Sequence, residues 1–346
     1  MPSIEQFLAH AVGGAPFDEA EMEALMGLVM EGDATPAQIA SLLTALRVRG
    51  ETVDEIVGAA RAMRARMVRV PLTGPAVDTC GTGGDGLGTF NVSTAAALVA
   101  AGAGARVAKH GNRAMSGRVG GADALEALGV QIELGPKGVA HCLEQAGVGF
   151  CFAPRFHAAM RFAAAPRREM GFRTMLNLLG PLANPAGASA QLIGVFAPEW
   201  TEPLATALGR LGVTRALVVH GGDGLDEISV AGPTRVSELA SGAVRTYELT
   251  PAAFGLGANA APLVTVDDAA ASAAVIRGVL AGDPGVALDL TLINAAAVLV
   301  VAAVATDWTD GLQRAEAAVA SGAATAALER LVAVSQASRD ADEERV

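Results

Sequence analysis

The chain has few cysteines and a shortage of positive charge, and each shortage excludes a class of protein. Its three cysteines, Cys80, Cys142 and Cys151, are odd in number and lack zinc-ligand spacing, which predicts reduced thiols in the cytoplasm. Acidic residues outnumber Lys and Arg by 36 to 25, which gives a net charge of −11. Because so acidic a surface repels a phosphate backbone, we expect no nucleic-acid partner.

The sequence also lacks an apolar run long enough to cross a membrane. The longest such run, residues 295–305, is shorter than the roughly 20 residues that a bilayer helix needs, so we expect a buried core helix there and no membrane partner. The first basic residue is Arg47, so the N-terminus has no positively charged region of a secretory signal. Apolar residues make up 51% of the chain and charged residues 18%, which excludes a disordered protein.

Residues 1–70 have the start signals of helices and predict a small helical N-terminal domain. Asp18 with Glu21, and Thr52 with Glu55, have the spacing of capping boxes, in which each side chain accepts a hydrogen bond from the other residue's backbone. Apolar residues recur at helical spacing after the first of these caps, which predicts a core face or a helix interface: Met22, Leu25, Met26 and Val29.

Residues 71–346 alternate short apolar stretches with loops and helices and predict a larger α/β domain. The expected fold is a mostly parallel central sheet covered by helices, with edge strands or a hairpin within residues 229–249 and alanine-rich helices from 267 to about 334. The last residues, from Ser338, are expected to fray. The expected strands are residues 76–79, 106–108, 148–153, 191–197 and 216–220.

A glycine-rich loop follows the first expected strand. Five of the eight residues from Gly81 to Gly88 are glycine, so backbone amides can face a ligand without obstruction. Asn91-Val92-Ser93-Thr94 follow at the start of a helix, where the helix dipole favours anions. The loop matches neither the Walker nor the dinucleotide fingerprint, and it predicts a phosphate or pyrophosphate cradle rather than an ordinary mobile turn.

Two further loops carry basic residues. Residues 109–121 place two Arg, one Lys and one His within ten positions directly after the second expected strand, which can neutralise several phosphate charges. Residues 155–185 place arginines beside aromatic and apolar residues, a combination that can bind an aromatic carboxylate. On spacing alone, however, exposed arginines are the more common explanation of this second pattern.

An acidic turn, His220-Gly-Gly-Asp-Gly-Leu-Asp226-Glu227, follows the fifth expected strand. Adjacent carboxylates are hard oxygen ligands that hold Mg²⁺ together with substrate phosphates, although an ordinary acidic turn has the same pattern. His220 alone is better explained as a hydrogen-bonded residue at a strand end. Because the ends of parallel strands meet at one edge of a sheet, the cradle, the basic loop and the acidic turn together suit a Mg²⁺-pyrophosphate substrate.

The motifs GTGGD, TFNVST, KHGNR, RREMGFRTMLNLLGPLANP and HGGDGLDE, in this order and spacing, resemble those of the anthranilate phosphoribosyltransferases. The resemblance covers nearly the whole chain. It implies a Mg²⁺-dependent pentosyltransferase of tryptophan biosynthesis, which transfers the phosphoribosyl group of 5-phosphoribosyl 1-diphosphate (PRPP) to the amine of anthranilate and releases pyrophosphate. It also implies a cytoplasmic homodimer, in which helices from about residues 155–183 join the N-terminal domain.

The resemblance implies roles at the matching positions. For anthranilate they are Gly81, His110, Asn112, His157 and Arg167, and for magnesium, expected as two ions, they are Ser93, Asp226 and Glu227. For PRPP they are Gly81, Gly84, Asp85, Thr89, Asn91, Val92, Ser93, Thr94, Lys109, His110, Gly111, Asn112, Arg113, Ala114, Met115, Ser116, Gly117 and Gly121. No classical acid–base pair is expected, because the amine of anthranilate is an aniline and is already neutral at pH 7.

The chain departs from the family pattern in its basic loop, where Gly117, Val119 and Gly121 stand at positions that commonly carry hydroxyls, and at Ala158, where proline is usual. These departures bear on PRPP affinity and on acceptor choice. Three alternatives therefore stay open: a paralogue using another aromatic acceptor, a pyrimidine-nucleoside phosphorylase, and a non-catalytic paralogue that binds nucleic acid. The acidic pair and the net charge disfavour the last two.

Overall fold

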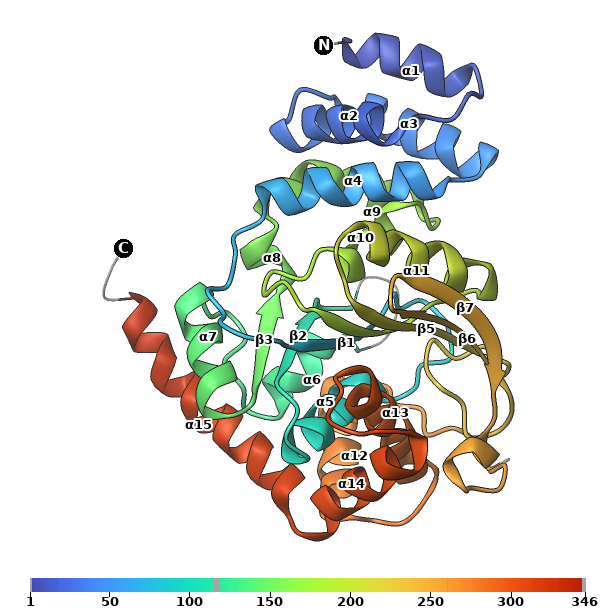
Figure 1. Cartoon of the computed structure of the whole chain (residues 1–346). Helices are drawn as coiled ribbons and strands as arrows, with labels where there is room; N and C mark the ends of the chain where they lie inside the picture. Colours follow the sequence, from blue (N-terminus) through green and yellow to red (C-terminus); the bar gives the residue numbers. More distant parts are fainter. Residues whose placement is uncertain (1, 115–118, 260, 344–346) are drawn as a thin grey trace.

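The computed structural model describes residues 2–114, 119–259 and 261–343, with only the backbone from residue 339 onward. A seven-stranded sheet forms its centre, in the order β3-β2-β1-β4-β5-β6-β7 (Figure 1). Strands β1 to β5 run parallel, whereas β6 and β7 form an antiparallel hairpin at one edge. The mostly parallel sheet and the hairpin predicted from the sequence are confirmed. The strands are β1 (Val77–Gly81), β2 (Val107–Gly111), β3 (Val148–Phe152), β4 (Ala190–Gly194), β5 (Arg215–Gly221), β6 (Thr234–Ala240) and β7 (Ala243–Leu249).

The central strands are buried on both faces because alternate side chains enter two different cores. Leu192 of β4 and Val219 of β5 belong to a cluster on one side of the sheet. Ile193 of β4 and Val218 of β5 belong to the cluster on the other side. Such strands are nearly continuous apolar runs, as is typical of a parallel sheet covered by helices.

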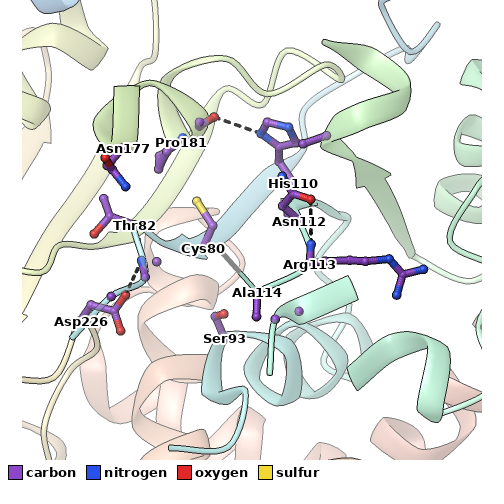
Figure 2. Close-up of a pocket in the computed structure, with 18 of the residues that line it drawn as sticks. Cys80, Thr82, Ser93, His110, Asn112, Arg113, Ala114, Asn177, Pro181 and Asp226 are labelled. Atoms are coloured by element: carbon purple, nitrogen blue, oxygen red, sulfur yellow. Dashed lines mark hydrogen bonds between the residues drawn. The ribbon is translucent and has the colours of Figure 1, made fainter. Parts of the chain in front are cut away.

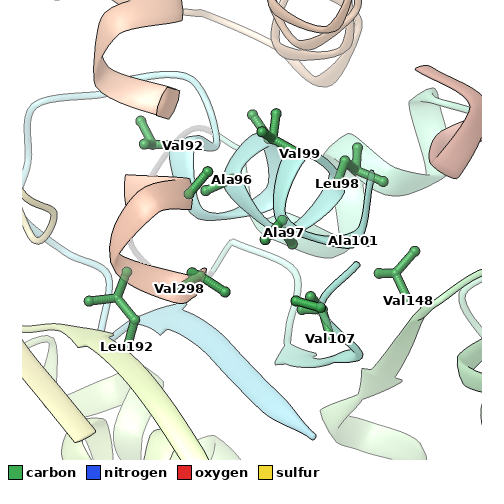
Figure 3. Close-up of a cluster of buried hydrophobic side chains, with 14 of the residues drawn as sticks. Val92, Ala96, Ala97, Leu98, Val99, Ala101, Val107, Val148, Leu192 and Val298 are labelled. Atoms are coloured by element: carbon green, nitrogen blue, oxygen red, sulfur yellow. The ribbon is translucent and has the colours of Figure 1, made fainter. Parts of the chain in front are cut away.

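The face below the sheet in Figure 1 is covered by alanine-rich helices. Figure 3 shows Ala96, Ala97 and Val298 packed between these helices and the strands. Residues 295–299 are fully buried in α13, so the core helix predicted for 295–305 is confirmed as far as Val301, where the helix ends. The elements on this side and at its edges are α5 (Val92–Gly102), α6 (Gly121–Ala127), α7 (Pro136–Gln145), η3 (Pro251–Phe254), α12 (Ala269–Ala281), α13 (Val286–Val301), α14 (Trp308–Ala320) and α15 (Ala323–Glu343).

Helix α15 continues past Ser338, where fraying was predicted, to Glu343, and residues 344–346 lie outside the described residues. The helix packs along α5 and α7, and the Ser338 hydroxyl donates to the Val334 carbonyl at 2.8 Å.

Helices cover the opposite face as well, with the N-terminal helices outermost (Figure 1). Both predicted capping boxes form: Asp18 accepts from the Glu21 amide at 2.8 Å, and Glu55 accepts from the Thr52 amide at 2.9 Å. The side chains of Met22, Leu25, Met26 and Val29 are buried in the core, as predicted. The elements on this side are α1 (Ile4–Val12), α2 (Glu19–Glu31), α3 (Pro36–Arg49), α4 (Val53–Arg66), α8 (Ala153–Phe156), η1 (Ala158–Met160), α9 (Arg161–Met170), α10 (Leu176–Leu182), η2 (Pro198–Trp200) and α11 (Thr201–Arg210).

Helix α9 packs against α2 and α3, and α10 packs against α4. If helices from residues 155–183 join a helical domain of residues 1–70, these are the contacts expected between them. The domain boundary itself stays a prediction. Within the described part of the chain, no single helix is long and apolar enough to span a membrane, while two bent helix pairs reach that length and composition together. All three cysteines are free thiols with buried side chains.

Candidate active site

A cavity of about 910 Å³ opens at the carboxyl ends of the parallel strands, between the sheet edge and helices α9 and α10. It brings together loops that are distant in the sequence: the glycine-rich loop, the start of α5, the end of β2 and the acidic turn after β5. The predicted residues that line it are Gly81, Gly84, Asp85, Thr89, Asn91, Val92, Ser93, Lys109, His110, Gly111, Asn112, Arg113, Ala114, Gly121, His157, Arg167, Asp226 and Glu227.

Of the predicted residues that the structure describes, Thr94 is not among those that line the cavity. It is buried, and its hydroxyl has no hydrogen-bond partner among the described residues. Met115, Ser116 and Gly117 lie outside the described residues, so their predicted role in binding PRPP has no structural account here.

Two paired glycines let the acidic turn cross the sheet edge. Gly81 of β1 lies opposite Gly194 of β4 in the parallel register. A Cβ on Gly194 would lie only 1.5 Å from the Asp226 backbone oxygen, and a Cβ on Gly81 would lie 2.3 Å from Asp226 Oδ2. The Asp226 carboxylate accepts a hydrogen bond from the Gly83 amide at 2.8 Å, so it is tied to the glycine-rich loop (Figure 2).

The carboxylates at this edge repel one another in a partly dehydrated site. Burial raises the pKa of Asp226 to about 6, and the nearby charge of Asp85 adds to the effect. Burial and the Asp226 charge raise the pKa of Glu227 well above its usual range, while Lys109 opposes the shift. Buried acids of like charge are stabilised by a bound cation, and this geometry therefore fits a divalent metal ion.

No group of three or more His, Cys, Asp or Glu side chains in the described ranges forms a complete metal-ligand set. A cation held by Asp226 and Glu227 would therefore take its other ligands from a hydroxyl, from water or from a substrate. Mg²⁺ is commonly bound in this way, through one or two carboxylates and substrate phosphates.

Lys109 is a buried cation at the floor of the cavity. Its ammonium donates to the Thr79 carbonyl at 2.7 Å and to the Ser93 hydroxyl at 3.0 Å. Burial lowers its pKa, whereas the surrounding acids raise it. These two bonds fix the charge beside the first turn of α5, where an anionic substrate group would arrive.

Arg113, the described arginine of the predicted basic loop, points elsewhere. The Arg113 guanidinium donates to Asp123 at 3.0 Å and to Glu126 at 2.8 and 3.1 Å, and these acids raise its pKa. Figure 2 shows its side chain directed away from Cys80 and Asp226. Two acids of α6 thus hold its charge at the rim of the cavity.

The far end of the cavity has a different character. His110 and His157 are buried there with ring centroids 5.0 Å apart, and His110 Nδ1 lies 3.0 Å from the Gly180 carbonyl oxygen. Burial lowers their pKa values to about 3 and about 4, respectively, so both rings are neutral at pH 7. Arg167 also lines the cavity, where it is half-buried, and burial lowers its pKa. A half-buried arginine together with neutral rings and apolar side chains suits an aromatic anion.

The prediction that His220 is a hydrogen-bonded residue at a strand end is confirmed, because its Nδ1 lies 2.7 Å from the Val195 carbonyl oxygen. The sequence analysis missed the apolar wall formed by Met63, Met160 and Leu179, and it assigned no role to Asn177, which also lines the cavity. Asn177 and Leu179 lie within the quoted motif RREMGFRTMLNLLGPLANP, which did not indicate which of its side chains face the cavity, whereas Met63 and Met160 lie outside the quoted motifs.

Comparisons with known proteins agree with this geometry. The "Glycosyl transferase family, helical bundle domain" matches residues 5–67, and the "Glycosyl transferase family, a/b domain" matches residues 73–325. The anthranilate phosphoribosyltransferase of Thioalkalivibrio sulfidiphilus is 55% identical over 91% of this chain and 93% of its own length. The chain belongs to the anthranilate phosphoribosyltransferase family.

Solved structures of the same family superpose closely on the chain. The enzyme from Thermus thermophilus has a TM-score of 0.88 at 45% identity and covers 95% of this chain and 99% of its own. The enzyme from Saccharomyces cerevisiae in complex with PRPP and Mg has a TM-score of 0.83 at 28% identity over 92% and 94% of the two chains. The same yeast enzyme in complex with 4-fluoroanthranilate has a TM-score of 0.85 at 27% identity over 97% and 99%. The family, the glycosyltransferase class and the fold predicted from the sequence are confirmed.

Proposed function

We propose that this chain transfers the phosphoribosyl group of PRPP to the amine of anthranilate, giving N-(5-phosphoribosyl)anthranilate and pyrophosphate in L-tryptophan biosynthesis. One observation carries the proposal: the same cavity has a glycine-rich loop, a buried lysine and two carboxylates at one end and two neutral histidines at the other, with a half-buried arginine also in its lining. The first end suits a metal-bound diphosphate, and the second suits an aromatic carboxylate. The family relatives that bind PRPP with Mg and 4-fluoroanthranilate support the same pair of substrates.

Magnesium fits the carboxylate end. Asp226, Glu227 and the Ser93 hydroxyl would hold it, and Asp85 nearby supports the expectation of two ions. When bound, the metal would neutralise the negative charge that develops on the departing pyrophosphate. Without the metal, the raised pKa values of Asp226 and Glu227 favour their protonated forms, so these residues are poorly suited to act as free carboxylates.

The remaining PRPP-binding roles fall to the glycine-rich loop and to the two segments that face it. Bare amides of the loop would donate to phosphate oxygens, since at Gly83, Gly84, Gly86 and Gly88 the backbone has the positive φ that glycine adopts without strain. Lys109 supplies a fixed positive charge beside them. The PRPP-binding residues predicted above, Thr94 and Arg113 included, are proposed in this sense; Met115, Ser116 and Gly117 extend the same set beyond the described residues.

Anthranilate would bind at the other end, with its carboxylate toward Arg167 and its ring among His110, His157 and the apolar wall. Asn112 and Gly81 also line the cavity and would contact the amine side of anthranilate. Because the aniline nitrogen is neutral at pH 7, it needs no strong base. Holding this nitrogen in line with C1 of the ribose, and holding the leaving diphosphate, would supply the rate acceleration.

The proposal includes a cytoplasmic homodimer. The three reduced, buried thiols agree with a reducing compartment. Two exposed apolar side chains on the helical layer, Val12 of α1 and Val48 of α3, are 75% and 83% exposed, which agrees with a surface that a second subunit covers.

The fluorescence of anthranilate tests the proposal directly. We expect its loss when PRPP and Mg²⁺ are added to catalytic amounts of the protein, and no loss when EDTA is present. If fluorescence persists while both compounds bind, the acceptor is a different aromatic amine. If phosphate instead of PRPP supports cleavage of a pyrimidine nucleoside, the phosphorylase alternative replaces the proposal. Binding of neither compound, together with salt-dependent retention on heparin, would favour the nucleic-acid-binding paralogue.

A further inference from the structure

Helix α13 carries a fully buried amide in an otherwise apolar stretch. Asn294 has no exposed surface, and its helical neighbours Ile293, Ala295, Ala296 and Ala297 are equally buried. Burying an amide costs free energy unless it is hydrogen-bonded, and asparagine is also a weaker helix former than the alanines beside it. An apolar side chain would pack here at lower cost, so the amide requires an explanation beyond packing.

The Asn294 side chain forms hydrogen bonds to both backbone polar groups of Ile228, the residue directly after the acidic turn. The Ile228 N–H donates to Asn294 Oδ1 at 3.0 Å, and Asn294 Nδ2 donates to the Ile228 carbonyl at 3.0 Å. The same Nδ2 donates to the Leu290 carbonyl, one turn earlier in α13, at 2.9 Å. The side chain is therefore oriented by its own helix and joined to a segment 66 residues away in sequence.

Ile228 directly follows Glu227, in a stretch without helix or strand. At Asp226 itself, the backbone oxygen lies against the bare Cα of Gly194, and the carboxylate accepts a hydrogen bond from the Gly83 amide at 2.8 Å. The acid pair is thus held by contacts at Asp226 and, directly after Glu227, by a two-sided hydrogen bond at Ile228.

We propose that Asn294 is a positioning residue that holds Asp226 and Glu227 together in the geometry of the metal site. The inference rests on the proposed function, because it assumes that these acids bind the metal. Like charges in a buried site repel, so an unrestrained turn would relax and move the carboxylates toward water. The two hydrogen bonds between Asn294 and Ile228 oppose this movement. Asn294 itself would contact neither the metal nor the substrate.

Substitutions at two positions of the same helix separate positioning from packing. Asn294→Ala and Asn294→Leu remove the amide with a smaller and a similar volume. Thr291→Val is the matched control, because Thr291 is also fully buried in α13 and its hydroxyl donates to the Ala287 carbonyl of its own helix at 2.8 Å. Asn294→Ser is a further variant should the first two not fold: a serine hydroxyl can bond within the helix as Thr291 does, but it cannot span both groups of Ile228.

Metal binding is the decisive readout, measured by Mn²⁺ electron paramagnetic resonance with PRPP present and no acceptor. We expect the folded Asn294 variants to bind Mn²⁺ at least fivefold more weakly than the unmodified protein. In turnover assays, half-saturating Mg²⁺ should rise by a similar factor, and the KM for anthranilate should stay within twofold. Thr291→Val should stay within twofold in every measurement. Folded Asn294 variants with unchanged Mn²⁺ binding would overturn the inference.

Asp226→Asn with Glu227→Gln distinguishes failure of this inference from failure of the proposed function. If that double variant binds Mn²⁺ normally, the metal site itself is misassigned. If the double variant loses Mn²⁺ and the Asn294 variants do not, only the positioning role fails. If both are right, Asn294→Ala added to the double variant causes no further loss.

Discussion

The carboxylate of Asp226 occupies the space that a side chain on Gly81 would fill. A Cβ on Gly81 would lie 2.3 Å from Asp226 Oδ2, which is closer than real Cβ contacts come. Since the acidic turn follows β5 and Gly81 ends β1, the strand β4 between them must also be bare at its end. Gly194 meets this requirement, because it lies opposite Gly81 in the register. The position of the acid pair therefore depends on two glycines that pair with each other.

We expect Gly194→Ala to cause a loss of activity out of proportion to its size. The new methyl would meet the Asp226 backbone oxygen at 1.5 Å, so the turn must shift and carry both carboxylates with it. Overpacking of this kind costs about 1–3 kcal/mol of the free energy of unfolding. Urea unfolding and initial rates measure the two effects, with an expected fall in kcat of at least tenfold.

Gly232→Ala is the control for that substitution, because no atom lies within 4 Å of its added Cβ and its φ is not in the left-handed region. It should leave both measurements nearly unchanged. Equal rates for Gly194→Ala and the unmodified protein would show that the placement of the acid pair is not critical.

Asp226→Asn with Glu227→Gln should lower turnover at least tenfold, because the two amides cannot neutralise a divalent cation. The substitution also removes two buried like charges whose pKa values are raised, so the free energy of unfolding should not fall in parallel with activity. Initial rates over a Mg²⁺ titration and a thermal melt measure these opposite trends. Unchanged turnover at saturating Mg²⁺ would contradict the metal-ligand assignment.

Arg167→Ala should raise the KM for anthranilate at least tenfold and change the KM for PRPP much less. Arg167 is half-buried in the lining of the cavity, where a carboxylate of the acceptor would pair with its guanidinium. The neighbouring Arg168 is exposed and does not line the cavity, so Arg168→Ala is a closely matched control. Steady-state kinetics with each substrate varied in turn decide the assignment; similar effects at both positions would indicate a general electrostatic influence.

The neutral histidine His157 should make stability fall as the pH is lowered. Burial holds its pKa at about 4 in the folded protein, against 6.5 in the unfolded chain. The unfolded chain therefore binds a proton below pH 6.5 that the folded protein does not bind until about pH 4. The contribution of this residue to stability is complete above pH 6.5 and is lost as the pH falls through this window, by about 2 kcal/mol at pH 5.

His157→Phe should flatten this part of the pH dependence, since phenylalanine has a similar shape and does not titrate. The comparison needs the difference between variant and unmodified protein, because the raised pKa values of Asp226 and Glu227 act in the opposite direction. Urea midpoints between pH 8 and pH 4.5, without substrates, measure it. His141→Asn, at an exposed position, is the control, and equal pH profiles for His157→Phe and the unmodified protein would contradict a buried neutral imidazole.

Local signals in the sequence were sufficient for much of the fold. The pairs Asp18–Glu21 and Thr52–Glu55 are three residues apart, so the hydrogen bonds of each cap form whatever the rest of the chain does. Buried parallel strands were recognisable as short apolar runs that end in glycine. The polar end of α15 differs from the prediction, since the helix continues past Ser338 to Glu343.

The motif loops were likewise visible as candidates for binding, because glycines and charges gather in them. Their charges could not be assigned to the cavity without the structure. Lys109 and Arg113 are four residues apart in one loop, yet Lys109 is buried beside Ser93 and Arg113 is paired with two acids of α6. Spacing alone cannot distinguish these outcomes, since each depends on which neighbouring element carries the partner.

The sequence by itself determined the capped helices, the parallel α/β arrangement and the family, because these depend on residues close together in the chain or on motifs that keep their order. Only the tertiary structure decided how the acid pair is held. Asp226 lies against two glycines, Gly81 and Gly194, and Asn294 is hydrogen-bonded to Ile228. These contacts join residues that are tens to more than a hundred positions apart. Such contacts form only when strands and helices pack, and they give an isolated glycine or asparagine no local signature.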